Sequence, residues 1–426
     1  MPTRSSRAIA CGLACFAVMA WESFAVMQAG AAAETARFDF RALQALVQER
    51  PEYTIDELLE ALPISYRAHY VLVFSSRSLQ QASLRDPRAI LYGGDAHLMV
   101  SFNGSASQRG YEALETAEYD PDTARFQFRE IKPLPSGANG SLLQVSEVDP
   151  VRCRLCHGTP PRPLWDGTPF WPSVYGERYR SNLSAKERAG LATFLLQQPS
   201  HARYRSLPNA ERLAYRGTFA PEAKSEYDNT GQEAPNAEFS RLLGGLNIQM
   251  IARELRRAPN YEAYRYALLG VMENGCGGPA DFLPSSSRAV VAAGFRSFAV
   301  KTADADEQRD ESKRRRALDR SSGGVRSPVS LAASDEVTAV RFIAEYALGI
   351  HTDGWNLTFE KGGSDFRIAP EDGAALADIM RTEVARGDPK VGERASLGDY
   401  SSGDAYCRYL SERSRAAIAA IDSAVP

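Results

Sequence analysis

The chain has 426 residues, of which 44% are hydrophobic and 24% are charged, and its formal net charge is −3. A chain of this length usually forms two or three structural units, and these fractions are ordinary for a globular protein. A net charge so close to zero gives no reason to expect nucleic acid or an anionic membrane as a partner. Composition therefore indicates a weakly acidic globular protein and leaves its activity open.

The N-terminal segment, residues 1–33, has the order of a secretory signal peptide. Arg4 and Arg7 precede an apolar stretch over residues 8–21, and small residues follow it. This order of basic, apolar and small residues is typical of export signals, and Glu22 makes the apolar run too short for an ordinary membrane-spanning helix. We therefore expect a bacterial protein that is periplasmic or secreted, with no transmembrane segment in the mature chain.

A second interpretation of this segment is a lipoprotein signal. Cys15 is placed for lipid attachment, but Gly12 stands where a large apolar residue is usual. We favour the cleaved signal, with the cut after Ala33 or, as the alternative, after Ala20.

Residues 34–145 are predicted to form an N-terminal α+β domain. One helix is expected over Phe38–Gln48, and a second begins at the capping box of Thr54 and Glu57. Short β-rich runs separated by Ser, Gly and Asp-Pro then predict a small antiparallel sheet over residues 64–132. These runs are Tyr70–Phe74, Arg88–Tyr92, His97–Phe102, Ala113–Tyr119 and Ala124–Ile131.

The pattern Cys-x-x-Cys-His follows, at Cys153, Cys156 and His157. Two thiols at this spacing can form thioether bonds with the two vinyl groups of haem, and the adjacent histidine can donate an imidazole nitrogen to the iron. Because Asp149-Pro150 precedes the pattern, we expect it in a loop. In an exported chain it predicts one covalently attached haem c, with His157 as the proximal iron ligand.

Other uses of the cysteine pair fit the sequence less well. A zinc site would need two more Cys or His ligands at matching spacing, and Cys276 and Cys407 are solitary. A thioredoxin-like dithiol would lie where a strand passes into a helix, which Pro150 and Pro160 argue against. A disulfide between the paired cysteines would be strained and would not require the histidine.

The motif and the later stretch Leu183–Leu195 resemble the first motif and the closing helix of small c-type cytochromes. The resemblance covers roughly residues 150–198, which is shorter than a typical cytochrome domain. In addition, Pro161–Asp166 and Trp171–Gly176 are similar to a recurrent stretch of exported bacterial haem-motif proteins. The resemblance implies a cytochrome-c-like haem-binding segment over residues 146–200.

The sixth iron ligand departs from the cytochrome pattern. Small cytochromes usually place a methionine between the motif and the closing helix, but residues 158–198 contain neither Met nor His. His201 is the nearest distal candidate, and His97, Met99 and Met250 are others. Without one of them the iron would stay five-coordinate.

Aromatic residues after the motif are candidates for the walls of a haem pocket. Trp165, Trp171 and Tyr175 are flat apolar partners of the kind that a porphyrin face needs, and Arg162 could pair with a haem propionate. The alternatives are that the aromatic residues fill a small core and that the arginine faces solvent.

A covalent haem suggests electron transfer with a redox partner protein. The alternatives are a haem enzyme (peroxidase-like) or a gas sensor with an open iron coordination site, and a protein whose haem is structural. The enzyme hypothesis needs a distal acid/base pair that the sequence does not locate.

Residues 201–426 are predicted to form a mainly helical domain. Residues 302–328 contain mixed charges, Ser and Gly without apolar periodicity, so we expect a mobile loop there. Trp355–Phe359 and Asp365–Ile368 favour a hairpin. The expected fold class is α+β: a small N-terminal antiparallel sheet, the short haem-binding segment and a mainly helical C-terminal part. The helices are expected at Glu238–Arg257, Tyr261–Glu273, Asp335–Leu348, Pro370–Ala385 and Asp404–Ile421.

Cys276 and Cys407 are predicted to form a disulfide. Cys276 lies in a Gly- and Pro-rich stretch, and Cys407 lies in the first turn of the last expected helix. An oxidising compartment favours a disulfide over the alternative of two unrelated buried thiols. The Cα atoms of the two cysteines should then lie within about 7 Å of each other.

Export can be tested directly. Because a signal peptidase would remove the first segment, mass spectrometry of the mature protein should find its N-terminus at Glu34, or at Trp21 for the alternative cut. A soluble cytoplasmic pool that retains Met1 would contradict export.

Overall fold

The computed structural model describes residues 37–75, 80–135, 141–157, 161–163, 174–175, 184–210, 213, 235–273, 276–301, 335–350, 352, 370–393 and 404–423. The chain divides into two compact units, residues 1–39 and 40–426, and the elements below belong to the second. The expected signal peptide, the loop over 302–328 and the hairpin over 355–368 lie outside the described residues.

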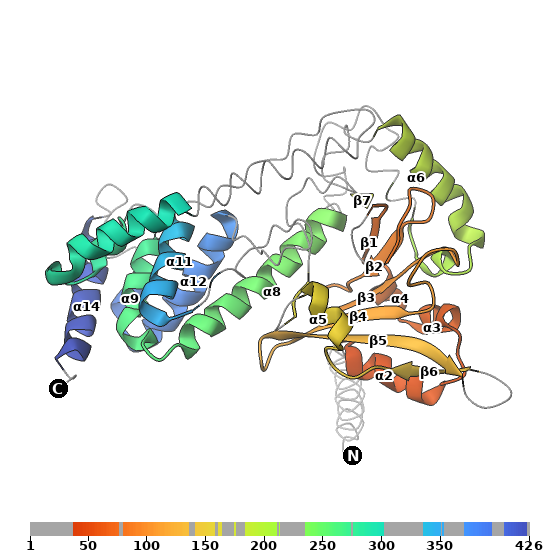
Figure 1. The fold of residues 1–426 in the computed structure, drawn as a ribbon, viewed down its shortest axis with the longest axis horizontal. Helices are drawn as coiled ribbons and strands as arrows, with labels where there is room; N and C mark the ends of the chain where they lie inside the picture. The colour runs from red at the N-terminus through yellow and green to blue at the C-terminus, as the bar shows by residue number, and fades with distance from the viewer. Residues whose placement is uncertain are drawn as a thin grey trace, which may run out of the picture. The chain divides into compact units, whose positions relative to one another are not determined.

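The N-terminal half of the larger unit is built on one antiparallel sheet of seven strands in the order β6-β5-β4-β3-β2-β1-β7 (Figure 1). Strands β1 to β6 form a meander, in which each strand pairs with the next one along the chain, and β7 pairs with β1 at the far edge. The strands are β1 (Tyr70–Val73), β2 (Arg88–Leu91), β3 (Leu98–Phe102), β4 (Leu114–Asp120), β5 (Arg125–Pro135), β6 (Ser141–Val145) and β7 (Val174–Tyr175).

Five of these strands confirm the predicted β-rich runs, and the α+β class is confirmed. The predicted extent of the sheet, residues 64–132, is too short, because β6 and β7 were not expected. Strand β7 has only two residues, too few for an alternating pattern to be recognised.

The register of the strands defines two faces. Met99, Ala117 and Phe128 are paired across β3, β4 and β5 and therefore point to the same side. They belong to one apolar cluster with Phe239 and Leu243 of helix α8 (Pro235–Arg257), and we call this side the α8 face.

The opposite side is the α2 face, which includes Phe102 and Glu118. Helix α2 (Phe40–Glu49) lies against it: the N–H of Phe40 donates to Glu118 Oε1 at 3.0 Å. Helices α3 (Ile55–Ala61) and α4 (Ile64–Arg67) follow α2. The capping box predicted at Thr54 is present at the start of α3.

Helix α6 (Ala185–Gln197) also starts at a predicted capping box, formed by Ser184 and Glu187. It buries Leu191 and Phe194, and the short 3₁₀ helices η3 (Gln198–Ser200) and η4 (Tyr204–Ser206) follow it. The ring of Tyr204 packs against Phe194 and, at 6.3 Å between centroids, against Phe102. This segment therefore covers part of the α2 face.

The C-terminal part is mainly helical over its described residues, as expected. Its apolar core combines buried residues of α8 with those of the helices that follow. These elements are α9 (Tyr261–Met272), η5 (Pro279–Phe282), a helix over residues 285–301, α11 (Asp335–Leu348), α12 (Pro370–Gly387), α13 (Pro389–Gly392) and α14 (Asp404–Asp422).

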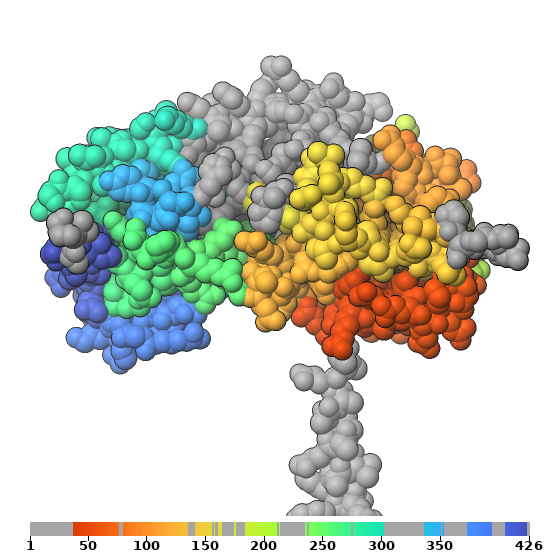
Figure 2. Space-filling view, turned by 60° about the horizontal axis from the view of Figure 1, so that its bottom comes forward, coloured from red at the N-terminus to blue at the C-terminus, as the bar shows by residue number. Residues whose placement is uncertain are grey.

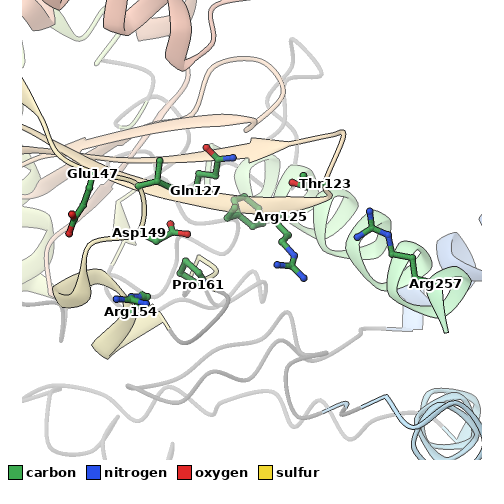
Figure 3. Close-up of a pocket in the computed structure, with 10 residues that line it drawn as sticks. Thr123, Arg125, Gln127, Glu147, Asp149, Arg154, Pro161 and Arg257 are labelled. Atoms are coloured by element: carbon green, nitrogen blue, oxygen red, sulfur yellow. The ribbon is translucent and has the colours of Figure 1, made fainter. Parts of the chain in front are cut away.

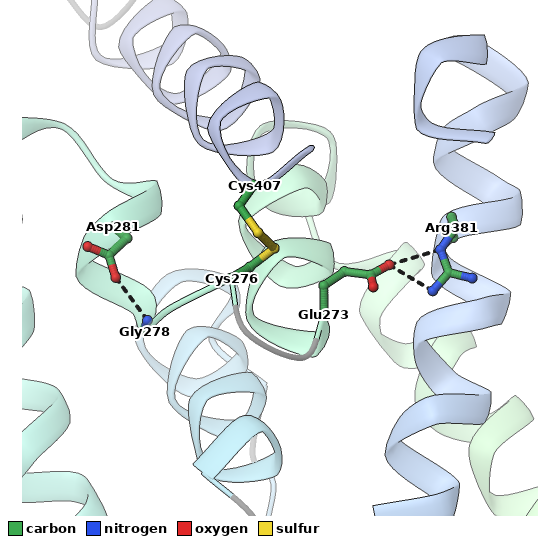
Figure 4. The surroundings of a disulfide bond; sticks show 6 residues. All are labelled: Glu273, Cys276, Gly278, Asp281, Arg381 and Cys407. Carbon is green, nitrogen blue, oxygen red and sulfur yellow. Dashed lines mark hydrogen bonds and ion pairs between the residues drawn. A yellow bond between two sulfur atoms is a disulfide. The ribbon is translucent and has the colours of Figure 1, made fainter. Parts of the chain in front are cut away.

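Cys276 and Cys407 are joined by a disulfide, with 5.1 Å between their Cα atoms (Figure 4). The bridge links the segment after α9 to the first turn of α14. Beside it, Glu273 is nearly fully buried, and its Oε1 accepts from Nε and Nη2 of Arg381 at 2.9 and 2.7 Å. The covalent link and this charged pair tie three helices together.

No helix among the described residues is both long enough and apolar enough to cross a membrane.

Helix α6 offers a matched pair of leucines for a stability test. Leu191 is 0% exposed, whereas Leu196 is 84% exposed. Because a buried truncation leaves a cavity, Leu191→Ala should lower the free energy of unfolding by about 2–5 kcal/mol, and Leu196→Ala by less than about 0.5 kcal/mol. Urea denaturation followed by circular dichroism measures both. Equal losses would contradict the packing described for α6.

The disulfide closes a loop with a sequence separation of 131 residues. In the chain-entropy model, removing it through Cys276→Ser should lower the free energy of unfolding by about 5 kcal/mol. A reducing agent should lower the wild-type value to that of the variant and leave the variant unchanged. Identical stabilities of the two oxidised proteins would contradict the predicted contribution of the bridge.

Candidate functional site

The cysteine motif lies on helix α5 (Val151–His157), so the prediction of a loop is wrong. Pro150 stands just before the helix, where its missing N–H costs nothing, and its carbonyl accepts from the N–H of Cys153 at 2.8 Å. The helix has only seven residues, too few for its apolar spacing to predict it. Pro150 precedes the helix in sequence and Pro160 follows it. A short helix can start after one proline and end before the next.

The helix explains why the motif spacing brings the three predicted haem residues together. Cys156 follows Cys153 by three positions and His157 follows it by four, and residues at these spacings share one face of a helix. Leu155 falls on the opposite face and is 80% exposed.

The side chains of Cys153 and His157 are turned towards the sheet. Cys153 is half-buried and packs against the apolar cluster of the α8 face. The imidazole of His157 lies 4.4 Å from the ring of Phe128, between centroids. On the flank of α5, Arg152 forms an ion pair with Glu130, whose side chain is almost fully buried. The motif is therefore held against β5 by one ring contact and one charged contact.

The environment of His157 fixes its protonation. Its Nδ1 lies 2.8 Å from the carbonyl oxygen of Arg162, and because a carbonyl only accepts, Nδ1 is the donor. Burial lowers the pKa of His157 below its ordinary value. A neutral imidazole with the proton on Nδ1 leaves the Nε2 lone pair for a metal ion, the arrangement found in metal-ligating histidines.

A cavity of about 930 Å³ opens beside α5. Figure 3 shows that its labelled side chains come from β5 and its preceding turn, from the segment between β6 and α5, from α5, from Pro161 beyond it and from the end of α8. Its volume lies in the range of about 300–1,000 Å³ that is usual for ligand pockets. The lining residues are Thr123, Arg125, Phe126, Gln127, Glu147, Val148, Asp149, Arg154, Pro161 and Arg257.

Three arginines of this cavity, Arg125, Arg154 and Arg257, form no ion pair with another described residue. The carboxylate of Asp149 is already engaged, since its Oδ1 accepts from the N–H of Phe128 at 2.7 Å. Glu147 also lines the cavity and forms no ion pair with another described residue, so the cavity offers three cationic groups, one carboxylate and apolar groups. No sequence pattern marks this grouping of arginines, because they come from distant parts of the chain.

One predicted pocket residue lies on the opposite side of the sheet from His157. Tyr175 pairs with Leu72, which puts it on the α2 face, and its hydroxyl donates to the carbonyl of Leu84 at 2.8 Å. Burial raises the pKa of that hydroxyl. Its proposed place in the wall of a pocket at His157 is therefore corrected: it packs the opposite face.

The distal candidate His201 is also on the α2 face. Its ring stacks on Tyr204 at 4.3 Å, and Tyr204 in turn packs against Phe102. The sheet thus separates His201 from His157, so the prediction of His201 as a sixth ligand is corrected. The two histidines are near each other in sequence only.

Met99 and Met250 are the alternatives that share a side with the motif. Met99 is part of the apolar cluster against which both Cys153 and Met250 pack. Of the remaining predicted residues, Arg162 contributes its carbonyl to His157, and Trp165 and Trp171 lie outside the described part of the chain.

No group of three or more His, Cys, Asp or Glu side chains that could hold a metal ion occurs among the described residues. Comparisons with known proteins found no matching protein family, no matching curated protein and no matching solved structure.

Proposed function

We propose that the chain is an exported bacterial monohaem protein of the c-type cytochrome kind, which transfers single electrons. The observation that carries this proposal is the arrangement on α5: Cys153, Cys156 and His157 share one helix face, and the Nδ1–H of His157 is held by a backbone carbonyl. The export-like order of residues 1–33 supports it, since attachment of this haem takes place outside the bacterial cytoplasm.

The residues present fit a covalently bound haem. The thiols of Cys153 and Cys156 would hold it through thioether bonds, and Nε2 of His157 would bind the iron. When bound, the haem would supply a one-electron redox couple. The cavity beside α5 adjoins the motif through Arg154, and neither Cys153 nor His157 is among its described lining residues.

The charges around this cavity fit the same group. A haem carries two propionate carboxylates, and Arg125, Arg154 and Arg257 are cations that other described residues do not neutralise. Charge-assisted hydrogen bonds from guanidinium groups would offset the cost of taking carboxylates out of water.

Two observations bear on the choice between electron transfer and the alternative of a haem enzyme or gas sensor. The methionines Met99 and Met250 lie on the face that receives Cys153, and a thioether ligand raises the potential of a haem and suits electron transfer. His201 lies on the other face of the sheet, so it is not available as a sixth iron ligand. The loss of this ligand favours the haem enzyme or gas sensor, which needs an open coordination site.

Haem attachment is the experiment that tests the proposal. The wild-type protein, expressed for export together with haem-attachment machinery, should stain for haem after denaturing electrophoresis, since thioether bonds survive denaturation. Cys153→Ser or Cys156→Ser should weaken the stain, and the double variant should abolish it.

Leu196→Ala is the control, because it truncates an exposed side chain outside the motif at little cost in stability and should leave the stain intact. A colourless wild-type protein under these conditions would refute the proposal, and so would a stain that persists in the double variant.

A further inference from the structure

We infer that a largely buried ion pair on the α8 face, formed by Arg88 and Glu115, sets the reduction potential of the haem. This inference rests on the proposed function, since it assigns two residues that regulate the same site. With Glu130 and Arg152 the pair forms a charged row across the sheet, from β2 through β4 and β5 to α5.

The row follows from the register of the strands. Met99 and Ser101 are two residues apart on β3, so Ser101 is also on the α8 face. Glu115 stands opposite Ser101, and Glu130 stands opposite Glu115. Nη2 of Arg88 donates to Ser101 Oγ at 2.7 Å and to Glu115 Oε2 at 2.8 Å. The ion pair therefore links β2 to β4 across this face.

The charges of the row are balanced in two pairs. Like charges directly opposite each other on a sheet repel, as the carboxylates of Glu115 and Glu130 do here. Each carboxylate has its own arginine, Arg88 for Glu115 and Arg152 for Glu130. Removing the charge of one member therefore leaves one uncompensated charge beside α5.

The pair lies within electrostatic reach of His157. The ring of Phe128 contacts the imidazole, and Phe128 pairs with the residue two positions from Glu115. Burial is the main cause of the lowered pKa of His157, and the hydrogen bond to the Arg162 carbonyl raises this pKa. After these, Glu115 raises the same pKa and Arg88 lowers it. A haem iron bound to His157 would experience the same two charges.

Stability does not account for the pair. Nε of Arg88 is buried and has no hydrogen-bond partner among the described residues. A buried donor without a partner is costly, and a buried ion pair is weak evidence for stability. This unsatisfied donor is consistent with an electrostatic role for the guanidinium.

The opposite face of the sheet carries a matched pair, Arg129 and Glu118, on β5 and β4. The side chains of Arg129 and Glu118 are 13% and 22% exposed, against 14% and 30% for Arg88 and Glu115. The two pairs therefore differ mainly in the face of the sheet that they occupy, and only one of them shares the face of His157.

The sign of the effect follows from the charge of the iron. The oxidised haem carries one more positive charge than the reduced haem, so Glu115 stabilises the oxidised form and Arg88 the reduced form. One electron enters from a donor, and no bond forms or breaks. A unit charge within about 10 Å of a partly buried centre, at an effective dielectric constant of about 20, changes the equilibrium constant for reduction about tenfold.

The test is a spectroelectrochemical titration of the exported, haem-stained protein with small redox mediators. Figure 2 shows the segment that contains α5, in yellow, uncovered on one side of the molecule, so mediators can reach it. Glu115→Gln should raise the midpoint potential and Arg88→Gln should lower it, each by about tenfold in the equilibrium constant, or about 59 mV. The double variant should return to the wild-type potential, because it removes a neutral pair.

Three control variants exclude a structural cause. Arg88→Lys keeps the charge and should keep the wild-type potential. Glu118→Gln and Arg129→Gln remove the charges of the matched pair and should change the equilibrium constant by less than about twofold. Glu115→Gln keeps the shape of the side chain and an acceptor for Arg88, so it should fold. If Arg88→Gln does not fold, the comparison of Glu115→Gln with Glu118→Gln decides.

Shifts of the same sign in Glu115→Gln and Arg88→Gln would overturn the assignment, and so would unchanged potentials in both. A shift in Glu118→Gln as large as that in Glu115→Gln would also overturn it. In each of these cases the haem stain leaves the proposed function standing. A wild-type protein without the stain would overturn the proposed function and this assignment together.

Discussion

Strand β5 holds the motif helix in place through two side chains on the same face. The ring of Phe128 packs under the imidazole of His157, and the nearly buried carboxylate of Glu130 binds the guanidinium of Arg152. Glu130 is nearly buried, whereas the side chain of Arg152 is 49% exposed, so water screens this pair in part. Together with the ring contact it limits where a short, seven-residue helix can sit. Every proposed property of the site depends on that placement.

The protonation of His157 follows from the same placement. Packing against the sheet removes water from the imidazole, and this burial favours its neutral form. The Nδ1–H of the ring donates to the carbonyl of Arg162. The other nitrogen keeps its lone pair. On the far side of the helix Leu155 remains in solvent, so one helix carries the proposed haem residues on one face and an exposed apolar side chain on the other.

The sheet meander and the two capping boxes could be predicted because their signals are local: alternating apolar residues, turn residues, and Ser or Thr three positions before Glu. Helix α5 could not, since seven residues are too few to show a period and the neighbouring prolines suggested a loop. The prediction that Cys153, Cys156 and His157 hold a haem rests on their spacing alone and stays a prediction.

The other site residues show where such reasoning ends. His201 and Tyr175 are near the motif in sequence, but each lies on the opposite face of the sheet. Tyr175 shares the face of its partner Leu72 in β1, and His201 stacks on Tyr204, which packs against Phe102 of β3. Pairing across strands is a long-range property that spacing cannot reveal. For the same reason the arginines around the cavity, which come from α5, β5 and α8, could not be grouped beforehand.

The visible absorption spectrum of the purified, exported protein tests the central claim most directly. A single covalently bound haem with His157 and a second protein ligand predicts a Soret band with the sharp reduced-state bands of six-coordinate, low-spin iron, in a ratio of one haem per chain. A high-spin spectrum that shifts on adding cyanide would contradict electron transfer through a six-coordinate site. A protein with no Soret band would contradict the haem itself.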